Sequence, residues 1–174
     1  MAALANQRRD FERAAQIVSD SGGRVVGRTK LQKIAYLLEA TGLGEGFSFE
    51  YRHYGPYSED LTIAARSARL LGLITEEECP TTWGGFYSIY TAKIPASSDA
   101  SRARLAQIAV GADPIELELA ATAAFLAAEA NTDPWGETTR RKPEKATTAR
   151  LESAKNLYRQ LQRVATPKRL PAIT

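Results

Sequence analysis

The chain has 174 residues, of which 44% are hydrophobic and 25% charged, a composition typical of a globular domain with a hydrophobic core. Its single cysteine, Cys79, excludes an intramolecular disulfide, and no apolar run approaches the roughly 20 residues of a membrane span. The N-terminus has no signal-peptide pattern, so we expect a cytoplasmic protein with no membrane partner. The net charge of +3 is a weak indication of a nucleic-acid partner.

Two helices are predicted at the start of the chain. Apolar residues recur at helical spacing over residues 6–21 and again over residues 28–42. In the second segment Thr29 is the expected N-cap and Gly42 the expected stop, because short polar residues favour helix starts and glycine favours the position after a helix. We expect a single domain over residues 1–165, followed by a loose tail over residues 166–174.

A third helix is predicted after a segment rich in glycine and aromatic residues. Residues 43–57 are expected to hold a short extended stretch, and Ser58 is expected to cap a helix that ends at Gly72. The acidic residues that follow Ser58 suit the positive end of the helix dipole. The expected buried face comprises Leu61, Ala64, Ala65, Ala68 and Leu71.

The period of the pattern then changes from helix to strand. Aromatic and β-branched residues flank a polar tip, which predicts a β-hairpin with strands near residues 73–77 and 86–92 and a turn at residues 83–85. Three helices followed by a hairpin is the order of a winged helix-turn-helix. We therefore expect a mostly α, α+β fold with a winged-helix-like hairpin near residues 73–92.

The remainder of the chain is predicted to be helical, over residues 97–111, 113–130 and 144–164, with a polar connector over residues 131–145. In the middle helix, Asp113 is the expected cap, Pro114 suits the first turn, and Glu116 could reach back to the cap. The fold class is thus a helical domain with a hairpin and additional C-terminal helices.

The sequence lacks the residue patterns of a metal site or a known catalytic centre. His53 and Cys79 are each the only residue of their type, whereas zinc sites need three or four ligands. There is no nucleophile elbow and no P-loop. We expect no metal, no cofactor and no enzyme activity. An enzyme acting on a nucleotide or small molecule would require a deep pocket around His53 with the hydroxyls of Tyr54 and Tyr57 unpaired.

DNA binding is the main alternative. In a winged helix the third helix would enter the major groove, which makes Arg66 and Arg69 the candidate DNA contacts. Acidic residues at Glu59 and Asp60, and again at residues 76–78, oppose a phosphate backbone. The same scaffold also serves protein contacts, so it does not decide the function.

A protein-binding module is the third class. Tyrosines and tryptophans that lie on loops and hairpins are typical interface anchors, because one end is apolar and the other forms hydrogen bonds. Half or more of these rings are nevertheless expected to be core. The candidates are Tyr51, Tyr54, Tyr57, Trp83, Phe86, Tyr87, Tyr90 and Trp135.

Three motifs resemble those of the Panacea (SocA-like) antitoxin domain superfamily, which includes YwgA-like proteins. They are Lys30-Leu31-Gln32-Lys33, the turn Tyr54-Gly55-Pro56-Tyr57-Ser58, and Gly72-Leu73-Ile74 at the end of the third helix. The resemblance covers about residues 28–75.

The resemblance implies a mostly helical fold without catalytic residues. It also implies one of two roles: an antitoxin that neutralises a cognate toxin by direct binding, or an adaptor that presents a partner for proteolysis. In the first case the toxin gene is expected beside the antitoxin gene, in a prophage or mobile element. Many antitoxins also bind their operator DNA. The turn itself is expected to be structural, with Tyr54 and Tyr57 packed against the second helix. The candidate partner contacts are Arg52, His53, Tyr54, Tyr57, Trp83, Arg140, Arg141 and Lys142.

Overall fold

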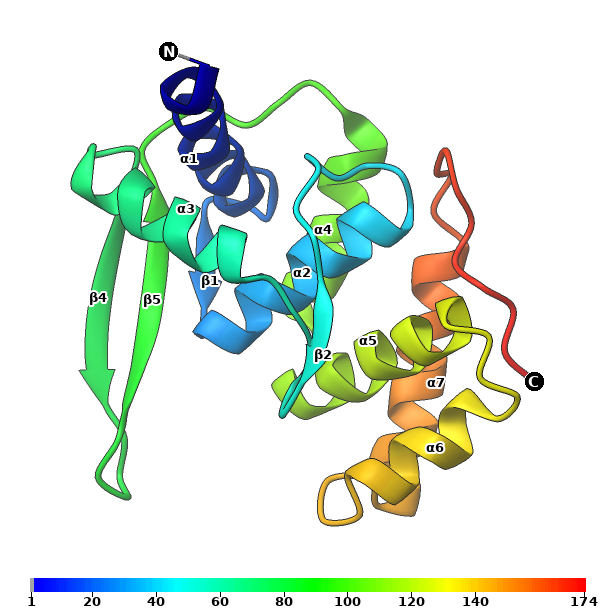
Figure 1. Cartoon of the computed structure of the whole chain (residues 1–174). Helices are drawn as coiled ribbons and strands as arrows, with labels where there is room; N and C mark the ends of the chain where they lie inside the picture. Colours follow the sequence, from blue (N-terminus) through cyan, green and yellow to red (C-terminus); the bar gives the residue numbers. More distant parts are fainter. Residues whose placement is uncertain (1) are drawn as a thin grey trace.

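The computed structural model describes residues 2–174, with side chains from residue 10 onward (Figure 1). The predicted α+β class is confirmed, because helices dominate and the strands form two small antiparallel sheets. The elements in chain order are α1 (Ala2–Asp20), β1 (Arg24–Val26), α2 (Arg28–Ala40), β2 (Glu50–Arg52), β3 (Gly55–Tyr57), α3 (Glu59–Leu70), β4 (Ile74–Pro80), β5 (Phe86–Ala92), α4 (Ala100–Gly111), α5 (Pro114–Ala128), α6 (Pro134–Arg141) and α7 (Thr148–Gln162).

The winged-helix-like hairpin is present: β5 has the predicted bounds, and β4 is longer than expected. β4 and β5 pair over seven residues each and project away from the helices, as Figure 1 shows. A short strand that the sequence did not predict, β1, adds to β5 and completes a sheet of order β1-β5-β4. Val25 lies opposite Tyr90 in this register, and both side chains are buried. The sheet is thereby fixed to α1 at its base.

The start of α2 differs from the prediction. The helix begins at Arg28 after Gly27, so Thr29 lies inside the first turn and does not cap it. Gly27 has a φ of 104°, a conformation that favours glycine, and its amide donates to the carbonyl of Ser88 on β5 (2.7 Å). The chain passes from β1 into α2 in one residue, and this tight turn leaves no position for a side-chain cap.

Helix α3 starts and ends where predicted, but one residue of its expected buried face is exposed. The hydroxyl of Ser58 accepts from the amide of Leu61, as expected of an N-cap. Leu71, expected in the buried face, is the C-cap of the helix and is 59% exposed. Gly72 follows with a φ of 77°, which turns the chain towards β4.

Helix α5 is the centre of the C-terminal half. It packs against α2, α6, α7 and β3, and most of its surface is buried. Asp113 caps it by accepting from the amides of Ile115 and Glu116, and Pro114 occupies the first turn as predicted. The expected reach of the Glu116 side chain back to the cap is not observed. Its alanines allow close helix packing on several sides: Ala120, Ala121, Ala123 and Ala124 have no exposed surface.

The predicted polar connector over residues 131–145 is wrong, because it contains helix α6. Asp133 caps this helix by accepting from the amide of Gly136, and Pro134 occupies the first turn. Trp135, considered as an interface anchor, is buried against Tyr158 with ring centroids 5.8 Å apart. The last helix accordingly starts at Thr148 rather than near residue 144.

The C-terminal tail carries no helix or strand, but it is packed rather than loose. The amide of Lys168 donates to the carbonyl of Thr41 at the end of α2 (2.9 Å). Leu170 is buried, and the hydroxyl of Tyr158 donates to the carbonyl of Pro171. The tail therefore connects α2 to α7.

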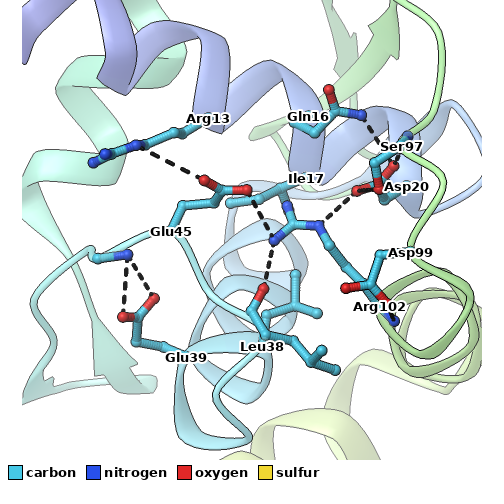
Figure 2. A network of polar contacts seen from close by, with 12 residues as sticks. Arg13, Gln16, Ile17, Asp20, Leu38, Glu39, Glu45, Ser97, Asp99 and Arg102 are labelled. Atoms are coloured by element: carbon cyan, nitrogen blue, oxygen red, sulfur yellow. Dashed lines mark hydrogen bonds and ion pairs between the residues drawn. The ribbon is translucent and has the colours of Figure 1, made fainter. Parts of the chain in front are cut away.

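A buried ion pair joins the two halves of the fold (Figure 2). Arg102 on α4 binds Asp20 at the end of α1, and the same guanidinium donates to the carbonyl of Leu43 and contacts Glu45. Burial alone would raise the pKa of Asp20, but hydrogen bonds from Ser97, Arg102 and Gln16 lower it below its ordinary value. The carboxylate therefore stays ionised as the partner of Arg102.

Replacing Arg102 by alanine is expected to cost about 3–5 kcal/mol of unfolding free energy, because it leaves the buried carboxylate of Asp20 without its ion-pair partner. Urea unfolding followed by circular dichroism measures this cost. Arg104→Ala is the matched control on the same helix, where the side chain is exposed, and should change stability by no more than about 0.5 kcal/mol. Equal costs for the two variants would contradict a structural role for this ion pair.

Candidate functional site

The two motifs at residues 30–33 and 54–58 are hydrogen-bonded to each other. The side-chain amide of Gln32 donates to the carbonyl of Ser58 (2.9 Å) and accepts from the amide of Ser58 (2.8 Å). This pairing satisfies both backbone groups of a buried residue, as a neighbouring strand would. Because Ser58 caps α3, Gln32 fixes the position at which α3 starts relative to α2.

The other residues of the first motif also have structural partners. Lys33 is 1% exposed, and its ammonium donates to the carbonyl of Pro56 (2.8 Å). Lys30 donates to the carbonyls of Val110 and Ala112 at the end of α4, where a cation complements the helix dipole. Leu31 is buried in the core. The motif thus links α2 to the β2–β3 hairpin and to α4.

Gly55 is required by space as well as by conformation. Its φ is 93°, and a Cβ placed there would lie 2.5 Å from the hydroxyl of Thr122 on α5. The glycine lets the hairpin backbone lie directly against α5. The expected turn at Gly55-Pro56 is displaced: His53 and Tyr54 form the turn, and Gly55 and Pro56 belong to β3, where they pair with Arg52 and Tyr51.

A buried carboxylate binds the two lysines that contact the β2–β3 hairpin from the side of the C-terminal helices. Glu118 on α5 binds the ammonium groups of Lys142 (2.7 Å) and Lys145 (2.9 Å). Lys142 in turn donates to the carbonyl of His53 (3.0 Å), and Lys145 lies over the ring of Tyr54 at 4.7 Å. The C-terminal helices therefore hold the hairpin from behind.

The pKa of Lys33 is strongly lowered by its surroundings. Burial lowers its pKa from 10.5 to about 7, and the positive charges of Lys142 and Lys145 add to this effect while Glu118 opposes it. A neutral amine can still donate to the carbonyl of Pro56, so the contact does not require the charge.

A cleft of about 490 Å³ lies between α2, α3, the β2–β3 hairpin and the base of the β4–β5 hairpin. Its size lies in the range of binding sites for small molecules and peptide side chains. Its wall combines apolar residues such as Leu31 and Leu61 with tyrosines. The charged lining residues are Arg28, Lys33, Arg52, Arg66, Arg69 and Glu76.

The ring of Tyr57 is held in place within this cleft. Its hydroxyl forms a hydrogen bond with the hydroxyl of Thr62 (2.8 Å), and the guanidinium of Arg52 lies 4.6 Å from its ring centroid. Tyr54 is 57% exposed, so it does not pack against the second helix as expected. The hairpin therefore presents one fixed and one accessible tyrosine to the cleft.

The structure brings together only part of the predicted set of partner contacts. Arg52, Tyr54 and Tyr57 line the cleft, with His53 exposed at the tip of the β2–β3 hairpin. Trp83, 86% exposed, lies on the separate β4–β5 turn. Lys142 is buried on Glu118 and is not a surface contact.

The two predicted partner contacts that precede Lys142 are exposed, and so are the two alternative DNA contacts on α3. Arg140 and Arg141 both pair with Glu137 (2.9 Å each), and Arg141 also lies over the ring of Tyr51. On α3, Arg66 and Arg69 line the cleft, so they share one surface with the predicted protein contacts.

Gln32, Glu118 and Lys145 could not be recognised individually from the sequence. Gln32 was noticed only as part of a motif, and Glu118 had no local signal because its partners lie more than 20 residues away. Arg28, in the first turn of α2, lines the cleft and was also not singled out from the sequence.

The conditions named for a catalytic site are not present in the described residues. His53 is not among the residues that line the cleft, and the hydroxyl of Tyr57 is paired with Thr62. Within residues 2–174, no group of three or more metal-ligating side chains comes together. No helix in this range is both long enough and apolar enough to cross a bilayer.

Comparison with known proteins finds a partial relative. The chain is similar to the uncharacterized protein YwgA of Bacillus subtilis (strain 168), with 32% identity over 68 residues. The similarity covers 39% of this chain and 40% of that protein, so the chain matches less than half the length of this relative. No family model and no solved structure matches. The resemblance to YwgA-like proteins is supported, and membership of the Panacea superfamily stays a prediction.

Gln32→Ala is expected to lower the unfolding free energy by about 2–4 kcal/mol, because the three hydrogen bonds of its side chain are lost and the buried amide of Ser58 is left unpaired. Chemical denaturation measures the change. Gln107→Ala, at an exposed position on α4, is the matched control and should be nearly neutral. A neutral result for Gln32→Ala would show that the two motifs are not held together by this contact.

Wild-type protein should gain stability relative to Lys33→Met as the pH rises from about 7 towards 10.5. In this window the folded state has released the proton of Lys33 while the unfolded state still holds it, so unfolding takes up a proton and becomes less favourable with rising pH. Urea unfolding of both proteins across the window gives the difference directly. A difference that is constant or decreases with pH would mean that Lys33 is not buried as described.

Proposed function

We propose that this chain is a non-enzymatic protein-binding module that acts as an antitoxin, neutralising a cognate toxin by direct binding in the cytoplasm. The observation that carries the proposal is the cleft at the point where the motifs of the resemblance meet. The buried polar groups of Gln32 and Lys33 are used in internal contacts, whereas Tyr54 and the cleft arginines remain accessible.

The residue types around the cleft support a protein partner. Tyrosine and arginine are enriched among the residues that contribute most to protein–protein binding. Tyr54 is accessible and Tyr57 is fixed by its hydroxyl, so a partner side chain would meet rings that lose little freedom on binding. The toxin would be inhibited because the bound antitoxin covers its active surface.

The β4–β5 turn offers a second accessible aromatic group. Trp83 and Phe86 are 86% and 72% exposed, and Tyr87 is partly exposed on the same hairpin. Large aromatic side chains left in water on one hairpin are typical of an interaction surface. A partner that covers both the cleft and this turn would bury the base and the tip of the same hairpin.

Operator binding is the second candidate function, alone or together with toxin binding. The observation that favours it is the exposure of Arg66 and Arg69 on α3, the helix that follows α2 in the winged-helix order. Arg69 is, however, within 3.8 Å of Glu76, and Glu59 and Asp60 lie exposed at the leading end of α3. An electrophoretic shift of promoter DNA that requires both arginines would favour this candidate.

Co-expression with the product of the adjacent gene tests the antitoxin proposal. We expect that product to arrest growth alone, and this chain to restore growth and to co-purify with it. Tyr54→Ala should weaken the complex about tenfold or more, since it removes an accessible aromatic contact. Arg104→Ala, exposed on α4 and outside the cleft, serves as the matched control.

The proposal fails if the neighbouring product is not toxic, or if the wild-type chain neither restores growth nor co-purifies with it. Loss of rescue with both variants alike would instead indicate a general effect on the protein, which circular dichroism of each variant detects.

A further inference from the structure

We propose that the cleft between α2, α3 and the β2–β3 hairpin binds an acidic, partly apolar peptide segment of the partner, and that Arg66 forms the ion pair with its carboxylate. The inference rests on the proposed function and deepens it, because it assigns the chemistry of the partner at this site.

The charges that line the cleft are unbalanced. Four of its side chains are arginines and one, Glu76, is acidic, while Lys33 is buried and its pKa is lowered to about 7. The carboxylate of Glu76 is already shared, at 3.5 Å from Arg28 and 3.8 Å from Arg69. A cleft with this lining attracts negative charge and repels positive charge, and it would also speed the association of an acidic partner.

Arg66 differs from the other arginines of the cleft. Arg28 pairs with Glu78 as well as Glu76, and Arg52 pairs with Glu50 and Glu59. Arg66 is exposed and forms no ion pair with any side chain that the structure describes. Its guanidinium is therefore available for a bidentate contact with a carboxylate, without first breaking an internal pair.

The uncharged part of the cleft favours a peptide over a small inorganic anion. The rings of Tyr54, which is 57% exposed, and of Tyr57 contribute apolar surface, and the nearly buried side chains of Leu31 and Ala65 line the same cleft. A free phosphate would leave this surface unused. A segment with an acidic residue next to an apolar one would match both parts of the wall.

A DNA duplex fits the same surroundings less well. The exposed carboxylates of Glu59 and Asp60 flank the cleft at the start of α3, and Glu77 and Glu78 are exposed on β4. Glu59 and Glu78 are paired with Arg52 and Arg28, but duplex phosphates that approach α3 would also meet Asp60 and Glu77, which form no ion pair among the described residues, and this opposes binding. The β2–β3 hairpin also lines the cleft that α3 faces, so that side of the helix is not an open surface.

Fluorescence anisotropy with a defined probe tests the inference. The probe is a short fluorescein-labelled peptide in which glutamates alternate with leucines and serines, and its control has glutamine at every glutamate. We expect the acidic peptide to bind about tenfold more tightly than its glutamine control, with an affinity that falls as salt is added. Amide shifts in heteronuclear NMR spectra should map to residues of the cleft.

Arg66→Gln should weaken binding of the acidic peptide about tenfold and leave the glutamine peptide unaffected. Arg104→Gln, the same change at an exposed position outside the cleft, should leave both affinities unchanged. The inference is overturned if the two peptides bind alike, if Arg66→Gln has no effect, or if inorganic phosphate binds the cleft more tightly than the peptide. A promoter duplex that binds more tightly than the peptide, and depends on Arg66, overturns it in favour of DNA.

The growth assay separates this inference from the proposed function. If wild-type chain and Arg66→Gln rescue growth equally, and the peptide does not bind, the antitoxin proposal stands and the acidic-segment inference is wrong. If the peptide binds as described but wild-type chain does not rescue growth, the antitoxin proposal is wrong and the preference of the cleft for acidic segments remains.

Discussion

The two-point hydrogen bond between Gln32 and the backbone of Ser58 is the constraint on which the cleft depends. It joins the middle of α2 to the residue that caps α3, and so sets how these two helices lie relative to each other. Lys33 adds a second attachment, through Pro56, to the hairpin in between. An unpaired buried amide or carbonyl is costly, so the three elements are held in one arrangement. The cleft in front of them is a consequence of that arrangement.

The C-terminal helices extend the same constraint to the rear of the hairpin. Glu118 holds Lys142 and Lys145, which contact the backbone of His53 and the ring of Tyr54. Such a cluster of buried charges is a weak source of net stability, but removing one member leaves the others uncompensated and is strongly destabilising. These contacts join the C-terminal helices to the β2–β3 hairpin, so substitutions in α5 or α6 are expected to alter the position of the hairpin at the cleft.

Local signals in the sequence identified the parts of the fold that local physics determines. Ser58 and Asp113 were recognised as caps because a short polar side chain before an apolar helix is a local pattern. Asp133-Pro134 carries the same signal as Asp113-Pro114, but the polar residues around it concealed α6. The cap at Thr29 was wrong because β1 pairs with a strand more than 60 residues away. Of the site, the cap at Ser58 and the extended stretch before it were predictable, whereas the exposure of Tyr54 was not, and the burial of Lys142 depends on a partner 24 residues distant.

Hydrogen exchange at the amide of Ser58 tests directly whether the side chain of Gln32 holds the start of α3 against α2. The account predicts that this amide is protected in the wild-type protein to the same degree as the interior amides of α2 and α3, because it donates to the buried side chain of Gln32. It also predicts that Gln32→Ala selectively removes this protection under conditions in which the interior of α5 stays protected. Rapid exchange of the Ser58 amide in the wild-type protein would contradict the account.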